Sequence, residues 1–144
     1  MEKPVNPEAV AELLNSAMIH LLRRAAREDI AAGIGPAQLS ALSVLVFGGD
    51  RTLGALADAE QVRPPTMTRV VAALEQVGLV HKQPSVDDRR SVRISATPAG
   101  RRLMERARER RIGALAARFD ALSPDDLATL ARAAELMEAA ARPD

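Results

Sequence analysis

Residues 53–96, LGALADAEQVRPPTMTRVVAALEQVGLVHKQPSVDDRRSVRISA, decide the expected fold of this chain. Two short helical patterns come first, and a two-stranded pattern follows them. The second helical pattern places its apolar residues on one helix face, at Met67, Val70, Val71, Leu74 and Val77. The prolines before it favour a helix start, and Gly78 favours its end. We therefore expect a short amphipathic helix that begins near Pro64.

A shorter helix is expected before it, over residues 53–60. Thr52 is placed to cap its start, and Leu56 and Ala57 are expected to face inward. The chain then breaks near Gln61, at the position where a helix-turn-helix usually has glycine. The usual core spacing of such a unit is matched by Ala57, Val62, Met67 and Val70. Together the two patterns predict a helix-turn-helix.

The opposite face of the second helix carries small groups and one arginine, at Pro65, Arg69, Ala72 and Gln76. Hydroxyls, free backbone N–H groups and the helix dipole at its first turn favour phosphate contact. Arg69 is alternatively placed to reach a guanine edge with its two donors. An ordinary amphipathic helix in an all-α bundle is the competing interpretation. The predicted DNA contacts here are Arg63, Pro65, Thr66, Thr68 and Arg69.

Two strands are expected next, over residues 79–83 and 90–96. In the second, Val92, Ile94 and Ala96 alternate with Arg93 and Ser95. The loop between the strands is charged, and arginines at a hairpin tip suit the narrow minor groove. The predicted DNA contacts of the hairpin are Lys82, Asp88, Arg89 and Arg90, where Asp88 is expected to orient Arg90. A hairpin at this place predicts a winged helix-turn-helix, which puts a helix in the major groove and a β-ribbon beside it.

The run Asp88-Arg89-Arg90, then a short strand and Thr97-Pro98-Ala99-Gly100, resembles the wing signature of the MarR family of bacterial regulators. Thr68-Arg69 with the following apolar pair, Leu74 and Gly78-Leu79-Val80, is similar to the family's recognition helix. The resemblance covers nearly the whole chain in length and helix order. It implies that Arg90 enters the minor groove.

Four further helices are expected around this unit. The first runs from a cap at Asn6 to about Ala32, and the next begins at Pro36 and ends at residues 48–50. A long helix follows over residues 97–121, and Ser123 caps the last one. The first, fifth and sixth helices carry apolar stripes that one small domain cannot cover, which predicts a twofold homodimer on a pseudo-palindromic operator. The fold class is mainly α with a small β-hairpin wing, as one domain over 1–144, with dimerisation helices at 1–34 and 98–144 and a DNA-binding module at 36–97.

Charge is unevenly distributed along the chain. Residues 61–111 contain twelve basic and five acidic residues, whereas the remainder contains eight basic and fourteen acidic ones. A basic field around the helix-turn-helix and wing suits a polyanion. The arginine run at 101–111 is interleaved with Glu105 and Glu109, so we expect salt-bridged solvated faces there, with direct phosphate contact as the alternative.

The family resemblance also implies a pocket for small aromatic anions between the dimerisation helices and the DNA module. The residues expected near it are His20, Arg24, Ser43 and Phe47, together with the start of the fifth helix. For His20, an ordinary partly buried histidine is the competing interpretation. Phe47 and Phe119 are the only aromatic residues, so a stacking pocket has few aromatic groups available.

Several classes of protein are disfavoured by composition. The chain has no cysteine, which excludes disulfides and thiolate metal sites, and no cluster has metal-ligand spacing, so we expect no metal and no cofactor. Ser43 or Ser91 with His81 and Asp87 lack a catalytic motif, so we expect no enzyme. No apolar run approaches membrane length and no signal peptide is evident, so we expect a cytoplasmic protein without membrane contact.

The leading hypothesis is a dimeric, sequence-specific transcriptional repressor that a small effector releases from double-stranded DNA. The alternative is an architectural or partner-recruiting winged helix that has no effector. Sequence-selective affinity for DNA separates the two, because an architectural protein binds all duplexes equally.

Overall fold

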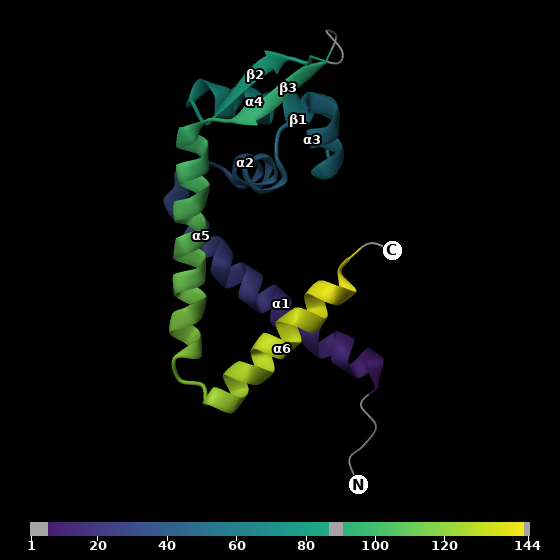
Figure 1. The fold of residues 1–144 in the computed structure, drawn as a ribbon, viewed down its shortest axis with the longest axis vertical. Helices are drawn as coiled ribbons and strands as arrows, with labels where there is room; N and C mark the ends of the chain where they lie inside the picture. The colour runs from purple at the N-terminus through teal and green to yellow at the C-terminus, as the bar shows by residue number, and fades with distance from the viewer. Residues whose placement is uncertain (1–5, 87–90, 143–144) are drawn as a thin grey trace. The chain divides into compact units, whose positions relative to one another are not determined.

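The computed structural model describes residues 6–86 and 91–142. It is mainly helical, with one small sheet (Figure 1). The elements are α1 (Pro7–Asp29), the 3₁₀ turn η1 (Ile30–Ala32), α2 (Pro36–Gly48), β1 (Arg51–Thr52), α3 (Leu53–Ala59), α4 (Pro64–Gln76), β2 (Val80–Pro84), β3 (Val92–Ala96), α5 (Pro98–Phe119) and α6 (Pro124–Ala140). The chain divides into two compact units, Met1–Arg111 and Ile112–Asp144.

The helices begin where short-range capping predicts. The Asn6 side chain accepts a hydrogen bond from the Glu8 N–H at 3.0 Å, and the Thr52 hydroxyl accepts one from the Ala55 N–H at 3.2 Å. Ser123 likewise accepts from the Asp126 N–H at 3.1 Å. Each side chain satisfies a backbone donor that has no partner within its own helix. The expected helix order and helix starts are therefore confirmed.

The sheet has a strand that the sequence pattern did not reveal. Its order is β1-β3-β2 and all pairs are antiparallel, with Arg51 opposite Ile94 and Val80 opposite Ala96. β1 has two residues, which is too short for an alternating pattern to be visible. β3 is consequently a central strand with neighbours on both sides. β1 also precedes α3 directly and so fixes the start of the helix-turn-helix (Figure 1).

The core of the first unit lies between α2, α3, α4, the sheet and the first turns of α5. Its largest fully buried side chains are Leu42, Leu45, Leu56, Met67, Leu74, Ile94, Met104, Val71 and Val80. Burying each of these stabilises the fold by roughly 1.5–3 kcal/mol. The predicted inward positions of α3 and α4 are therefore confirmed for most residues, and α4 is held by the face that carries Met67, Val71 and Leu74.

Four expectations about burial are wrong. Val77 is 59% exposed because α4 ends at Gln76 and the chain leaves the helix there. Val62, in the turn, and Val92, at the outer end of β3, are also exposed. Ser95, expected to face outward, is buried, and it lies in the central strand of the sheet.

Apolar stripes remain uncovered on α1 and α6. Neither helix has a buried residue within its bounds, and both units expose large apolar side chains, including Leu13, Leu21 and Leu22 of α1 and Leu127, Leu130 and Leu136 of α6. No single described helix is long and apolar enough to cross a membrane. Two segments together meet the same criterion of length and composition, namely residues 7–32 (α1 with η1) and α2. They are bent by 92° relative to each other.

Candidate nucleic-acid interface

The outer face of α4 is accessible over its whole length. Pro65, Arg69, Ala72 and Gln76 are exposed, whereas Met67, Val71 and Leu74 on the opposite face are buried. The small Ala72 leaves the backbone approachable, and Arg69 supplies a forked donor. The expected division of this helix into a buried and an exposed face is confirmed.

The first turn of α4 differs from the expectation in one respect. Pro64 and Pro65 have no N–H, and the N–H groups of Thr66 and Met67 both donate to the Arg63 carbonyl, at 2.9 and 3.2 Å. The expectation of free backbone N–H groups for phosphate is therefore wrong. Contact with a phosphate at this helix start has to come from side chains.

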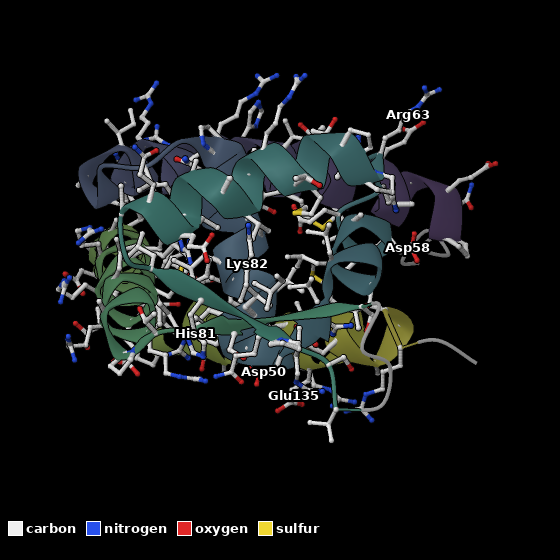
Figure 2. The ribbon with its side chains drawn as sticks, turned by 90° about the horizontal axis from the view of Figure 1, so that it is seen from above. Asp50, Asp58, Arg63, His81, Lys82 and Glu135 are labelled. Carbon is white, nitrogen blue, oxygen red and sulfur yellow. The ribbon has the colours of Figure 1, made fainter. Side chains whose placement is uncertain are left out.

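The side chains at this helix start are not equally available. The Thr68 hydroxyl donates to the Pro64 carbonyl at 2.9 Å, so its hydrogen is already used within the helix. The exposed Thr66 hydroxyl has no hydrogen-bond partner within the described residues. Arg63 precedes the helix without a side-chain cap, and its side chain extends away from the start of α4 (Figure 2). Arg63, Thr66 and Arg69 are therefore the available donors.

The turn between α3 and α4 has a left-handed residue that is not glycine. Gln61 has φ 54°, at the position where glycine is usual. The turn is closed by hydrogen bonds from the Gln61 N–H to the Asp58 carbonyl and from the Val62 N–H to the Ala57 carbonyl, at 3.1 and 3.0 Å. These bonds hold the backbone of Gln61 in a left-handed conformation, which is unfavourable for a residue with a Cβ atom.

Lys82, predicted as a DNA contact, has a partner within the chain. Its Nζ lies 3.1 Å from Oε2 of Glu75, and both side chains are partly exposed. The ion pair links the last turn of α4 to β2, so it joins the second helix of the helix-turn-helix to the wing. Any phosphate that binds Lys82 competes with the Glu75 carboxylate.

The wing is held at both ends of its described part. The Ser85 N–H donates to the Ser91 carbonyl at 2.9 Å and continues the β2–β3 ladder toward the tip. Arg93 Nε lies 3.6 Å from Asp50 Oδ2 and so is paired beside α2. The predicted contacts Asp88, Arg89 and Arg90 lie outside the described residues.

The junction between wing and α5 is tightly packed. The Thr97 hydroxyl donates to the Gly78 carbonyl at 2.7 Å and accepts from the Gly100 N–H at 3.1 Å. The Thr97 N–H donates to the Leu79 carbonyl at 3.0 Å. Gly100 packs so closely on Leu79, the residue before β2, that a Cβ placed there would lie 2.2 Å from the Leu79 carbonyl oxygen. The Thr-x-x-Gly segment thus connects the end of α4, the wing and α5.

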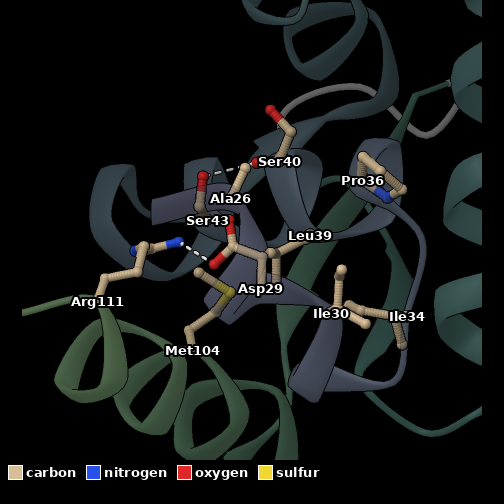
Figure 3. A pocket seen from close by; sticks show the side chains of 10 residues that line it. All are labelled: Ala26, Asp29, Ile30, Ile34, Pro36, Leu39, Ser40, Ser43, Met104 and Arg111. Atoms are coloured by element: carbon tan, nitrogen blue, oxygen red, sulfur yellow. Dashed lines mark hydrogen bonds and ion pairs between the residues drawn. The ribbon is translucent and has the colours of Figure 1, made fainter. Parts of the chain in front are cut away.

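A cavity of about 440 Å³ lies in the first unit, between the end of α1, α2 and α5 (Figure 3). Of the four residues expected near an effector pocket, Ser43 lines it. His20, Arg24 and Phe47 do not line it, and all three side chains are exposed. Sequence reasoning missed Asp29 and Arg111, which line the cavity as an ion pair of 2.8 Å. They are 82 positions apart, so no spacing pattern could have paired them.

The arginine run of α5 is mostly exposed but not internally paired. Arg101, Arg102, Arg106 and Arg108 are exposed, and neither Glu105 nor Glu109 forms an ion pair within the described part of the chain. The expectation of salt-bridged faces along this run is therefore wrong. The one ion pair that the described residues of the run form is that of Arg111, and it reaches across to α1.

Comparison with known proteins agrees with this geometry. The model of the MarR family matches residues 34–92, which include α2, the helix-turn-helix and β2, and reach the first residue of β3. An uncharacterised HTH-type transcriptional regulator of Mycobacterium bovis is 38% identical over 128 residues, which is 89% of this chain and 90% of that protein. An uncharacterised HTH-type transcriptional regulator of Mycobacterium leprae is also 38% identical over 128 residues, again 89% of this chain and 90% of that protein.

Solved structures share the fold along nearly the whole chain. A MarR family protein from Bacillus stearothermophilus superimposes with a TM-score of 0.79 at 28% identity, covering 93% of this chain and 96% of that one. A putative transcriptional regulator from Pseudomonas aeruginosa superimposes with a TM-score of 0.80 at 29% identity, covering 98% of this chain and 100% of that one. With its winged helix-turn-helix and these relatives, the chain belongs to the MarR family of helix-turn-helix transcriptional regulators.

Proposed function

We propose that this protein is a dimeric, sequence-specific DNA-binding regulator, and that it acts as a repressor released by a small effector. The observation that supports this most directly is the anchoring of α4. Three buried residues fix one face, and the other face is left free for the major groove. A fold neighbour, a mutant of S. aureus MepR, is bound to an oligodeoxyribonucleotide, with a TM-score of 0.69 at 18% identity.

The residues proposed to contact DNA divide into two groups. Arg69 faces the groove and is proposed to read a base edge, because a guanidinium matches the two acceptors of guanine. Arg63 and Thr66 are proposed to bind phosphate from side-chain donors, with Pro65 and Thr68 in close contact beside them. In the wing, Arg89 and Arg90 are proposed to enter the minor groove, with Asp88 orienting Arg90. Lys82 is proposed as a phosphate contact that competes with Glu75.

The proposed dimer rests on the uncovered stripes of α1 and α6. Exposed leucines on both helices leave apolar surface that association with a second copy would remove from water. A twofold dimer presents two α4 helices to half-sites about one helical turn, roughly 34 Å, apart. A monomer at micromolar concentration in sedimentation or light-scattering measurements would contradict this part of the proposal.

The test of DNA reading is selection of bound sites from random duplexes, followed by affinity measurements at several salt concentrations. We expect a near-palindromic site. Arg69→Ala should lose about 1–3 kcal/mol of discrimination at one base pair, and Arg63→Ala should weaken binding to all sequences and reduce the salt slope by about one. Arg106→Ala, which removes another exposed guanidinium from α5, is the matched control and should change neither quantity.

The alternative function is an architectural winged helix without effector. It predicts that the wild type binds all duplexes with equal affinity. It also predicts that Arg69→Ala lowers the affinity for every duplex by the same factor. The selection experiment separates the two functions, because an architectural protein returns no enriched sequence. Enrichment that Arg69→Ala leaves unchanged would contradict the proposed role of α4.

A further inference from the structure

The cavity beside α1 is lined mainly by aliphatic groups. They come from the end of α1, η1, α2 and α5, namely Ala26, Ile30, Ile34, Pro36, Leu39 and Met104. No aromatic side chain is among the described residues that line it. Its volume of about 440 Å³ falls in the range of small-ligand sites. Volume and lining therefore suit a small hydrocarbon body, and the described lining residues provide no ring for stacking.

The cavity has one positive and one negative side chain, and they neutralise each other. Arg111 Nη1 lies 2.8 Å from Asp29 Oδ1, and about three quarters of each side chain is shielded from solvent. No other charged residue is among the described lining residues. A ligand carboxylate would have to displace Asp29 from Arg111 or lie beside Asp29 as a like charge, and both cost free energy. The cavity therefore has no net attraction for an anion.

Two serines line the cavity, Ser43 and the exposed Ser40. The hydrogen-bonding capacity of the Ser43 hydroxyl is defined by its partner within α2. Its hydroxyl donates to the Ser40 carbonyl at 2.7 Å, so its hydrogen is used within α2 (Figure 3). The oxygen retains acceptor capacity toward the cavity that it lines. An incoming O–H can donate to this oxygen, whereas a carboxylate has no hydrogen to donate.

We propose that this cavity binds an uncharged alcohol with a mainly aliphatic body, and that it selects against the carboxylate of the same skeleton. The inference rests on the proposed control of DNA binding by a small molecule, and it names the chemical class of that molecule. It departs from the aromatic anion that family resemblance implies. The reason is that Asp29 occupies the position at Arg111 that a ligand carboxylate would take.

The first test compares matched ligands on the wild-type full chain. Binding of 1-octanol and octanoate is measured by titration calorimetry at neutral pH, with benzyl alcohol and benzoate as the aromatic pair. We expect 1-octanol to bind at least about tenfold more tightly than octanoate, a difference of about 1.4 kcal/mol. Benzoate should be the weaker member of its own pair. Tighter binding of either carboxylate, or no binding by any of the four, would overturn the proposal.

Two variants test the ion pair itself. Asp29→Asn leaves Arg111 without its carboxylate partner. The affinity for octanoate should therefore rise at least about tenfold, while the affinity for 1-octanol should change little. Arg111→Gln leaves the Asp29 carboxylate without its cationic partner. The affinity for octylammonium should therefore rise, and the affinity for octanoate should not. Asp58→Asn removes an exposed carboxylate from α3, outside the cavity, and is the matched control. If octanoate binds Asp29→Asn no better than wild type, the neutralisation argument is wrong. Far-UV circular dichroism checks that each variant is folded.

Ser43→Ala tests the hydrogen bond without altering charge. The variant should bind 1-octanol several-fold less tightly and octanoate as tightly as the wild type does. An equal loss of affinity for both ligands would contradict the role given to Ser43. DNA affinity without ligand is measured in parallel. If the wild type selects a DNA site but binds none of the four compounds, the cavity proposal fails and the regulator stands. If ligands bind as expected but no DNA site is selected, the proposed function fails instead.

Discussion

Replacing Gly100 by alanine is expected to destabilise the protein, although alanine favours helices. Gly100 lies in the first turn of α5, and an added Cβ would lie 2.2 Å from the Leu79 carbonyl oxygen and 3.2 Å from Leu42 Cδ1. Ordinary contacts begin at 3.4 Å, so the carbonyl or the helix must move by about 1.2 Å. The obstacle is backbone, which cannot rotate away as the end of a side chain can.

The magnitude follows from three contributions. Overpacking of this kind costs about 1–3 kcal/mol. A shift of the Leu79 carbonyl also disturbs its 3.0 Å hydrogen bond from the Thr97 N–H and the neighbouring 2.7 Å bond from the Thr97 hydroxyl to Gly78, at about 1 kcal/mol each. Better helix propensity returns up to about 1 kcal/mol. The net expectation is a loss of about 2–5 kcal/mol in the free energy of unfolding.

Urea unfolding followed by far-UV circular dichroism measures this loss, since the chain has no tryptophan or tyrosine for fluorescence. Protein concentration is held constant because a dimer unfolds in a concentration-dependent way. Gly54→Ala in α3 is the matched control, because nothing lies within 4 Å of its added Cβ. The control should be as stable as wild type or up to about 1 kcal/mol more stable. A Gly100→Ala variant that equals this control would refute the packing argument.

Three further outcomes are expected. Gln61→Gly should raise the free energy of unfolding by up to about 1 kcal/mol, because glycine removes the left-handed strain at φ 54°, and a lower urea midpoint would contradict this. Thr52→Ala should lower it by about 0.5–2 kcal/mol in the same assay, since the cap on the Ala55 N–H is lost, and an unchanged midpoint would show that the cap is dispensable. Glu75→Gln should tighten DNA binding and steepen the dependence of affinity on salt by about 0.9 in slope, because Lys82 is released for phosphate. Glu105→Gln removes an exposed acid that has no ion pair within the described residues and is the control, which should change neither the affinity nor the slope.

The sequence by itself determined where the helices begin and which face of α4 is buried. Caps such as Asn6, Thr52 and Ser123 act on N–H groups two or three residues away, and apolar periodicity acts within one helix. These interactions are complete within a few residues. The order of helix-turn-helix, wing and long helix could therefore be predicted without any long-range contact, and the same patterns carried the resemblance to the family.

The tertiary structure alone decided which groups at the candidate site are available. The pairing of β1 with β3, the ion pairs Glu75–Lys82 and Asp29–Arg111, and the contact of Gly100 with Leu79 join residues that lie far apart in the chain or that no periodic pattern connects. Their partners are set by how elements pack in three dimensions, so residue type and spacing contain no signal for them. This packing leaves Arg63, Thr66 and Arg69 with available side-chain donors at the start of α4, and it neutralises the cavity beside α1.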